Sequence, residues 1–284
     1  MKLVKFKRPD GRKINFELLK IIPQSSPRQV AMERHRHEYF SCFLVLEGTS
    51  KQEIDFEAYQ IKKHHLVFIP KGAIHWDIET NKLEGYQLLF KDDFLAKSML
   101  EMVNGFVKYA IFQHKLVLTL SSKQTREFIK LAELIEQEQN QAEHQNLIFI
   151  LQNLLLVWLN KMESIAQQSN SPNTFINNGV LFQKFITLLD QHYLTHKDVS
   201  FYCEELNCTA KKLSQTLTEV TGKSTNDIII DTILLEAKRD LCFSNLSIKE
   251  IAFNLGYENQ FYFSRIFKTK EKISPDEFRK KFAL

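Results

Sequence analysis

The sequence contains little cysteine and no closely spaced cysteine pair. Four cysteines occur among its 284 residues, and they are scattered along the chain without a CxxC motif. This count and spacing are typical of reduced thiols in a cytosolic protein. We therefore expect a cytoplasmic location for a chain whose cysteines are Cys42, Cys203, Cys208 and Cys242.

No segment of the sequence predicts a signal peptide or a membrane span. The basic residues near the start are not followed by an apolar core, which argues against a secretory signal. The longest apolar run, residues 147–159, is interrupted by Gln152 and Asn153 and is shorter than a bilayer requires. We therefore expect no membrane partner.

The sequence also lacks a large excess of charge of either sign. It contains 38 Lys and Arg against 34 Asp and Glu, a formal net charge of +4. Global charge therefore does not by itself predict a nucleic-acid-binding protein. Basic residues do gather near the C-terminus, where a solvated helix face is the alternative explanation: Arg265, Lys268, Lys270, Lys272, Arg279, Lys280 and Lys281.

Apolar and aromatic residues are abundant, and they indicate a folded globular protein. Hydrophobic residues make up 44% of the sequence and aromatic residues 12%, with 23 phenylalanines. Each phenylalanine supplies a large apolar area for burial. A chain of this length can form two domains with separate cores.

Residues 247–268 predict two short helices joined by a tight turn. Ser247 and Glu250 have the spacing of a capping box, which marks the start of the first helix. Gly256 lies where the chain must turn sharply, so we expect a positive φ there. In the second helix Phe263, Ile266 and Phe267 are expected to face inward. This arrangement is the one that places a helix in the DNA major groove.

The other face of the second helix is polar and partly basic, which suits contact with bases and phosphates. Arg265 is the best candidate for a bidentate contact with guanine. Phe261 is expected either to touch a thymine methyl group or merely to pack. The predicted face consists of Gln260, Phe261, Ser264, Arg265 and Lys268.

The same segment resembles the second helix-turn-helix of the AraC/XylS family of bacterial transcription regulators. In one position it departs from the family pattern, because Lys272 stands where the family usually has glycine after the recognition helix. The helix must then end with another cap or with a left-handed non-glycine residue. The matching positions are Ile251, Ala252, Gly256, Tyr257, Asn259, Tyr262, Phe263, Arg265, Phe267, Lys268, Ser274, Pro275, Phe278 and Arg279.

The resemblance implies a second, more degenerate unit upstream, at about residues 198–222, beside the one at 247–270. Asp198 and Thr209 are suitable caps for its two helices, and Gly222 is a suitable stop. A long helix at about residues 226–243 should join the units, with Ile233 where the family often has arginine. The implied DNA-binding residues are Lys211, Lys212, Ser214, Gln215 and Thr218 in the first unit, and Asn259 joins those of the second.

The N-terminal half, from about residue 28 to 115, reads as short strands punctuated by turns. Such a pattern predicts a β-sandwich or barrel of the jelly-roll type. Glu47-Gly48 and Pro70-Lys71-Gly72 are expected turns. The expected strands are residues 40–46, 54–59, 66–69 and 86–90.

This half resembles the cupin-like sensor domain of AraC-type regulators, on residues 34–38, 46–48 and 70–75 and on Gly85, Tyr86, Phe90, Phe94 and Leu95. The resemblance implies a small-molecule effector in the barrel. Candidate ligand-binding residues are His35, His37, His75, Trp76 and Tyr86, with plain core packing as the alternative for each aromatic ring.

The three histidines also raise the possibility of a metal. Enzymatic cupins hold one with His-x-His, a Glu a few residues on and a later His, and that Glu is missing here because Ser41 and Cys42 occupy the place. The sequence therefore predicts no metal and no cofactor. A metal-dependent cupin enzyme with an appended DNA-binding domain, or a ligand-independent regulator, remains the alternative.

Residues 121–168 show helical spacing of apolar residues and are expected to form a helical connector. Its second helix is apolar enough to pack within the chain or, as the resemblance favours, against a second subunit. The polar stretch after it predicts a linker. The expected organisation is 1–120 cupin-like domain, 121–168 connector, 169–176 linker and 177–284 DNA-binding domain.

Taken together, the sequence predicts an α+β multidomain protein. It would join a β jelly-roll (cupin-like) domain and helical connector to an all-α domain with two helix-turn-helix units. The predicted function is a non-enzymatic, sequence-specific transcription regulator, with activator as the family expectation. Its predicted partners are double-stranded promoter DNA, a small-molecule effector, RNA polymerase and a second copy of the chain.

Overall fold

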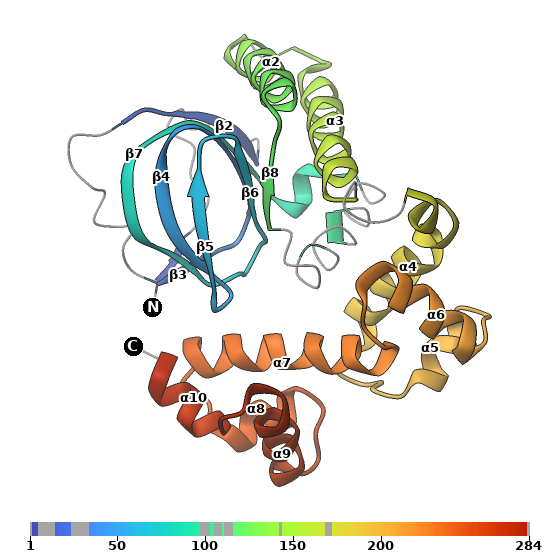
Figure 1. Cartoon of the computed structure of the whole chain (residues 1–284). Coiled ribbons are helices and arrows are strands. Elements are labelled where there is room, and N and C mark those ends of the chain that lie inside the picture. Colours follow the sequence, from blue (N-terminus) through green and yellow to red (C-terminus); the bar gives the residue numbers. More distant parts are fainter. Residues whose placement is uncertain are drawn as a thin grey trace. The chain divides into compact units, whose positions relative to one another are not determined.

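The computed structural model describes residues 2–4, 15–23, 34–96, 103–104, 110, 116–141, 144–167 and 172–282 (Figure 1). The chain forms two compact units, residues 2–172 and 173–284. Their boundary falls within the stretch that the sequence suggests as a linker. The β domain with its connector belongs to the first unit, and the helix-turn-helix region belongs to the second.

The first unit is built on an eight-stranded sheet among the described residues. Its order is β1-β3-β7-β4-β6-β8, with β2 paired to β7 and β5 to β4, and all pairs except β1–β3 are antiparallel. The strands curl around a common interior (Figure 1). Their bounds are β1 Lys2–Val4, β2 Phe16–Ile21, β3 His35–His37, β4 Phe40–Ile54, β5 Glu57–Lys62, β6 His65–Ile69, β7 His75–Phe90 and β8 Val117–Thr119, with a 3-10 turn η2 Asp92–Phe94.

The pairing of the two longest strands, β4 and β7, shows that one predicted turn is wrong. The Glu47-Gly48 pair does not end a strand, because β4 continues through it to Ile54 along β7. The register shifts on both sides of Glu47, which identifies an irregular, bulged stretch. Gly48 has φ +85°, and a side chain there would collide with the backbone of Lys82. The glycine therefore permits a bulge rather than a hairpin.

The true hairpin turn lies at Asp55-Phe56, inside the segment 54–59 that the sequence predicts as a strand. Both residues have positive φ, 46° and 73°, as a two-residue turn of this hand requires. The backbone N–H of Asp55 donates to the carbonyl of Ile74, and its carboxylate accepts from the N–H of Ile74. The predicted strands at 66–69 and 86–90 are confirmed as parts of β6 and β7.

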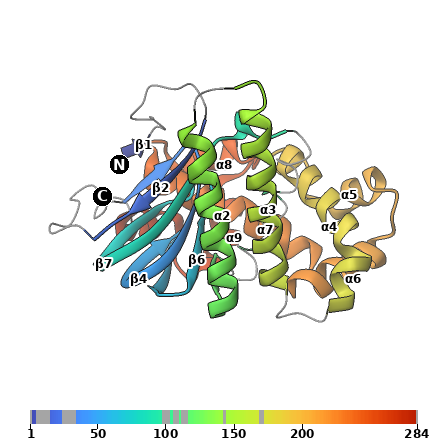
Figure 2. The same cartoon turned by 90° about the horizontal axis from the view of Figure 1, so that it is seen from above.

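The predicted helical connector is confirmed as α2 Ser122–Asn140 and α3 Leu147–Gln167, which lie side by side (Figure 2). Ser121 and Gln124 form a capping box at the start of α2. Near its end, Gln139 makes two hydrogen bonds with the backbone of Leu18, at 2.9 and 2.8 Å. The amide thereby occupies backbone groups on strand β2 and fixes the helix against the sheet.

Helix α3 is more apolar than the sequence-based prediction allowed. Its residues Leu147–Ala166 are long and apolar enough to cross a membrane by length and composition, which corrects the statement that the run is too short and too polar. The core helix of a soluble protein passes the same test. Trp158 is fully buried and meets Phe128 of α2 edge to face at 4.8 Å.

The second unit is all helical, as predicted, and α7 is the long helix expected between the two helix-turn-helix units. Helix α4 begins at Pro172, a residue tolerated in a first turn, so the later part of the predicted linker is helical. The helices are α4 Pro172–His192, α5 Val199–Glu205, α6 Ala210–Thr221, α7 Thr225–Phe243, α8 Ile248–Asn254, α9 Gln260–Glu271 and α10 Pro275–Phe282.

The core of this unit explains the departure at Ile233. The side chain is fully buried on α7, so it packs as an apolar residue where the family often has arginine. Tyr202 of α5 is also fully buried and contacts Phe185 edge to face at 5.4 Å. By contrast Cys203 and Leu206 of the same segment are only half-buried.

Candidate functional site

The second helix-turn-helix unit has the predicted local structure. The Ser247 hydroxyl accepts from the N–H of Glu250 at 3.2 Å, and the Glu250 carboxylate accepts from the N–H of Ser247 at 2.7 Å. Gly256 ends the following turn with φ +73°. The Lys197 ammonium donates to the carbonyls of both Gly256 and Leu194, at 2.8 and 2.9 Å. These bonds hold the turn against the segment that precedes the first unit.

Helix α9 is capped by Asn259, a residue that the sequence predicts to bind DNA. The Asn259 side-chain oxygen accepts from the N–H groups of Phe261 and Tyr262, at 2.8 and 3.2 Å. This bonding satisfies two of the helix's free donors. Asn259 therefore has a structural role in addition to its predicted place at the interface.

The exposed face of α9 carries the predicted groove-facing residues. Arg265 and Lys268 are exposed, Gln260 and Ser264 are partly exposed, and Phe261 is 75% exposed. The guanidinium of Arg265 lies 5.4 Å from the centre of the Tyr262 ring. On the opposite face Phe263 and Phe267 are fully buried, whereas Ile266 is only half-buried.

The first helix-turn-helix unit, α5 and α6, has the same kinds of caps and turns, made by different residues. The Asp198 carboxylate accepts from the N–H of Phe201, and the Thr209 hydroxyl accepts from the N–H of Lys212. Asn207, with φ +49°, lies in the turn between α5 and α6, and Gly222, with φ +73°, ends α6. All three predicted caps and stops of this unit are confirmed.

Helix α6 presents the residues of the first helix-turn-helix unit that are predicted to bind DNA. Lys211, Lys212, Gln215 and Thr218 are exposed, and Ser214 is partly exposed. Two of them also make contacts within the chain. Gln215 donates to the Glu219 carboxylate at 2.9 Å, and the Thr218 hydroxyl donates to the carbonyl of Lys223 at 3.3 Å.

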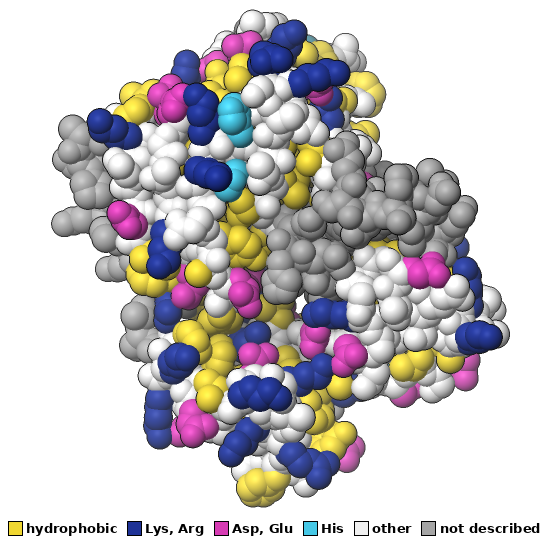
Figure 3. Space-filling model, in the orientation of Figure 1, with side chains coloured by type: hydrophobic (Ala, Val, Ile, Leu, Met, Phe, Trp, Pro, Cys, Tyr) yellow, Lys and Arg dark blue, Asp and Glu magenta, His cyan; other side chains and the backbone are white. Residues whose placement is uncertain are grey.

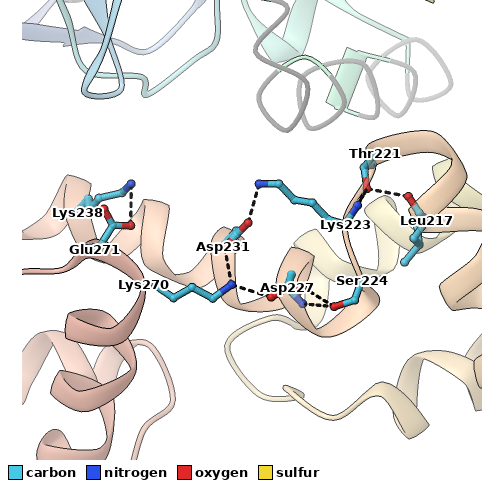
Figure 4. A network of polar contacts seen from close by, with 9 residues as sticks. All are labelled: Leu217, Thr221, Lys223, Ser224, Asp227, Asp231, Lys238, Lys270 and Glu271. Atoms are coloured by element: carbon cyan, nitrogen blue, oxygen red, sulfur yellow. Dashed lines mark hydrogen bonds and ion pairs between the residues drawn. The ribbon is translucent and has the colours of Figure 1, made fainter. Parts of the chain in front are cut away.

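A polar network ties both recognition helices to α7 (Figure 4). The Asp231 carboxylate of α7 pairs with Lys223, which follows α6, at 2.7 Å and with Lys270 of α9 at 3.5 Å. Lys270 also pairs with Asp227 at 2.7 Å. Asp231 therefore joins the ends of α6 and α9, and Lys238 pairs with Glu271 at 3.1 Å further along α7.

The helix-turn-helix motifs do not predict this network, because its acidic members lie outside them. Asp227 and Asp231 stand four residues apart on α7 and so share one face of that helix, a spacing that was visible in the sequence. Hydrogen bonds from Lys270 and Ser224 lower the pKa of Asp227. The carboxylate is therefore ionised at neutral pH and available to pair with Lys270.

In the β domain, three predicted ligand-binding residues converge. His35 of β3 stands opposite His75 of β7, and His37 follows on the same face of β3. The Nε2 atoms of His37 and His75 are 3.0 Å apart. One nitrogen from each of the three histidines lies within 4.8 Å of the others. The ring of His37 also stacks on Tyr39 at 4.3 Å.

Burial keeps the two inner histidines neutral. It lowers the pKa of His37 to about 3, with a further contribution from the nearby His35. Burial also lowers the pKa of His75 well below its usual value, with contributions from His37 and His35. Both imidazoles therefore carry no charge at neutral pH and keep a lone pair on one ring nitrogen.

The two remaining predicted ligand-binding residues lie in other surroundings. Trp76 stands opposite Glu53 of β4, and the Arg34 guanidinium lies 5.4 Å from its ring centre. Tyr86 is buried much further along β7, where it stands opposite Leu44. The structure thus brings the three histidines together and shows no contact between them and Tyr86 among the described residues.

Comparison with known proteins identifies the helical unit. A family model described as a helix-turn-helix domain matches residues 202–281, which span nearly all of both units. The "HTH-type transcriptional activator RhaR" of Escherichia coli O139:H28 is 23% identical over 255 residues, covering 89% of this chain and 88% of the relative. The protein of the same name from Salmonella dublin is 22% identical over 260 residues.

The helical unit therefore contains a helix-turn-helix domain, and the chain as a whole is similar to transcription regulators of the AraC/XylS type. Among solved structures, ToxT from Vibrio cholerae O395 is similar over 95% of each chain, with 14% identity and a TM-score of 0.43. The C-terminal domain of the response regulator yesN from Fusobacterium nucleatum is similar over 34% of this chain and 93% of its own, with 25% identity and a TM-score of 0.32. None of these matches supports the enzyme alternative.

The basic residues near the C-terminus of the helix-turn-helix domain are not all available to DNA. Lys270 is paired in the network, and Lys280 pairs with Asp276 at 2.7 Å. Arg279 donates to the backbone carbonyls of Leu241 and Leu246, so it fixes α10 against the end of α7. On the face shown in Figure 3, Lys and Arg alternate with Asp and Glu over these helices rather than forming one basic surface.

Replacing Lys272 with glycine should stabilise the helix-turn-helix domain. Lys272 ends α9 with φ +65°, a conformation that is strained for a residue with a Cβ atom. The side chain is exposed and donates to the carbonyl of Thr269 at 2.9 Å. We expect a gain of about 0.5–1 kcal/mol in the free energy of unfolding, measured with urea. Lys272→Ala should give no such gain, and equal stability of both variants would contradict the assignment.

Replacing Asp231 with asparagine should destabilise the packing of the two helix-turn-helix units against α7. The variant loses ion pairs to Lys223 and Lys270, which are partly exposed and contribute on the order of 1 kcal/mol together. The difference from wild type in urea unfolding should shrink at high salt. Asp276→Asn, which breaks only an exposed pair with Lys280, is the control. A salt-independent difference would show that the network does not act through charge.

Proposed function

We propose that this regulator activates transcription by binding promoters with two recognition segments about one helical turn of DNA apart. The observation that carries the proposal is the pair of capped helices α6 and α9, whose exposed faces are polar and whose ends are tied to α7. Because one rigid helix joins them, both recognition helices can be presented together. The target would then carry two segments in a fixed spacing.

In the proposed interface some side chains contact bases and others contact phosphates. Arg265 and Gln260 would contact base edges, since a guanidinium or an amide can bond two acceptor or donor positions of one base. Lys268 and Lys211 would contact phosphates and set the register. Other residues of the two exposed faces complete the surface: Lys212, Ser214, Gln215, Thr218, Phe261 and Ser264.

The activating role is supported by the relatives, which are named as transcriptional activators. An activator bound at a promoter acts through RNA polymerase, so polymerase is the expected macromolecular partner. Binding to chromosomal DNA also places the protein in the cytoplasm. A reporter gene downstream of the selected site would measure this role directly, and lower expression with the protein present would indicate a repressor instead.

We further propose that the β domain binds a small-molecule effector and that the connector forms a homodimer. The effector can alter activity only if it favours one arrangement of the chain over another. For the dimer, the support is a set of four large apolar side chains that are exposed on the connector. Its members are Leu134 of α2 and Ile148, Phe149 and Val157 of α3, which are 43–68% exposed.

The test of DNA recognition is selection from sheared genomic DNA of the source organism. Purified protein should retain a recurring site with two segments about one turn apart, and Arg265→Ala protein should retain it less well. The genes beside the site would then define the effector class for thermal-shift screening. Failure to enrich any sequence at low salt, with wild-type protein that is folded, would contradict the proposed function.

A further inference from the structure

The structure assigns a divalent transition-metal site to the three histidines His35, His37 and His75. This inference goes beyond the proposed function and departs from the sequence-based prediction of no metal. That prediction depended on a missing glutamate. The geometry shows that three imidazoles meet without it, and three histidines alone form a complete protein ligand set for Zn²⁺.

The backbone explains why the three side chains converge. Side chains of a strand alternate between its faces, so His35 and His37 project from the same face of β3. His75 is the residue of β7 that stands directly opposite His35 in the antiparallel pair. Three ring nitrogens from two paired strands are thus brought within 4.8 Å of one another.

For His37 and His75 the distance between the ring nitrogens requires only a small adjustment to accept an ion. Two nitrogens bound to one tetrahedral Zn²⁺ at about 2.0–2.1 Å lie roughly 3.3–3.4 Å apart. The observed separation between the Nε2 atoms of His37 and His75 is 3.0 Å. Moving these rings apart by a few tenths of an ångström would place both nitrogens at ligand distance. A ring nitrogen of His35 lies within 4.8 Å of the other two, so a larger shift of this third ring completes the ligand set.

The surroundings favour a cation at this position. Asp77, two residues after His75 on the same face of β7, supplies a carboxylate nearby. That carboxylate accepts hydrogen bonds from Ser50 and Gln52, which hold it in place. Imidazole donors with little thiolate or carboxylate suit Zn²⁺, Ni²⁺ or Cu²⁺ rather than Mg²⁺ or Ca²⁺.

The inference has a structural consequence. His35 and His75 form the registered pair between β3 and β7, so little backbone pairing joins the short strand to the long one. An ion bound by histidines of both strands would cross-link β3 to β7 through its coordinate bonds. Because the ion binds the folded chain, it should raise the melting temperature of the β domain as its concentration increases.

The experiment is to load the full-length chain with Zn²⁺, remove excess metal by gel filtration and measure bound metal by elemental analysis. We expect about one ion per chain for the wild type. His37→Gln and His75→Gln should lose it, whereas His144→Gln, at an exposed histidine outside the cluster, should retain it. Circular dichroism without metal checks that each variant is folded.

X-ray absorption of the Zn²⁺-loaded wild type keeps the inference testable even if the buried variants do not fold. A first shell with three imidazole nitrogens supports the site. Wild-type protein that retains no metal, cluster variants that retain as much as the wild type, or a shell with fewer than three imidazoles would each overturn it. These outcomes are independent of DNA binding, so the proposed function can stand if the metal site fails.

Discussion

Gly256→Ala is expected to destabilise the second helix-turn-helix unit by about 3 kcal/mol or more. The residue has φ +73°, where any Cβ atom costs on the order of 1–2 kcal/mol. In addition, a Cβ atom there would collide with the carbonyl oxygen of Leu194. Relief of that collision must move the backbone away from Lys197, which donates to both Gly256 and Leu194. Each hydrogen bond lost costs about 1 kcal/mol more.

Gly222→Ala separates these contributions. Gly222 has the same φ of +73°, but a Cβ atom there would meet no atom within 4 Å. Its substitution should therefore cost only the conformational strain, on the order of 1 kcal/mol. Urea unfolding followed by circular dichroism measures both variants in the full-length chain. The difference between them reports the close approach of Leu194.

The outcome for Gly256→Ala decides whether this turn is fixed by packing. A loss equal to that of Gly222→Ala would mean that the segment at Leu194 moves aside easily. A loss several-fold larger would establish that the second unit depends on the segment before the first unit. Binding of DNA should fall in parallel with the folded fraction, because α9 is positioned by this turn.

The C-terminal unit was predictable because its signals are local. Ser247, Asp198 and Thr209 cap helices through bonds to residues three positions away, so the short sequence window contains all the information. Gly222 and Gly256 mark positive φ for the same reason. The boundaries of α7 followed from continuous helical periodicity. Local chemistry, repeated twice, therefore specified this architecture.

The β domain was predicted less well because its turns depend on partners distant in the sequence. Glu47-Gly48 has the composition of a turn, yet pairing with β7 continues through it as a bulge. Asp55-Phe56 lacks the glycine that usually marks such a hairpin, and hydrogen bonds between Asp55 and Ile74 accompany its conformation. No local window contains Ile74.

The exposed helix faces were predictable because exposure follows helix periodicity, whereas groups that meet through tertiary contacts were not. The outward faces of α6 and α9 could be read from spacing alone. The links from Asp231 to Lys223 and Lys270 could not, since they join three separate helices. Convergence of His35, His37 and His75 likewise required the β3–β7 register, although a His-x-His pair was visible.

Arg265→Ala is expected to reduce sequence-specific DNA binding while leaving the fold intact. Arg265 is exposed on the polar face of α9, so its removal creates no cavity. The contact with the Tyr262 ring is lost, which costs about 0.5–1 kcal/mol of stability at an exposed site. If the guanidinium bonds one guanine, discrimination at that base should fall by about 1–3 kcal/mol, roughly 5- to 150-fold.

Two further variants separate base recognition from charge. Arg265→Lys keeps the positive charge but lacks the planar fork, so it should restore nonspecific affinity without restoring discrimination. Lys280→Ala removes an exposed charge that pairs with Asp276 on α10, and it should leave the preferred sequence unchanged. Titrations of each protein against the selected site and a single-base variant, at two salt concentrations, measure both properties.

The pattern across these proteins distinguishes a base contact from a phosphate contact. If Arg265 reads a base, Arg265→Ala lowers affinity for the selected site far more than for the variant site. If it contacts only phosphate, affinity falls equally for both sites and the dependence on salt becomes shallower by about one ion. Unchanged affinity and preference in Arg265→Ala would remove the residue from the interface. In that case the exposed Phe261 and the partly exposed Gln260, at the start of the same helix, become the next candidates for base contact.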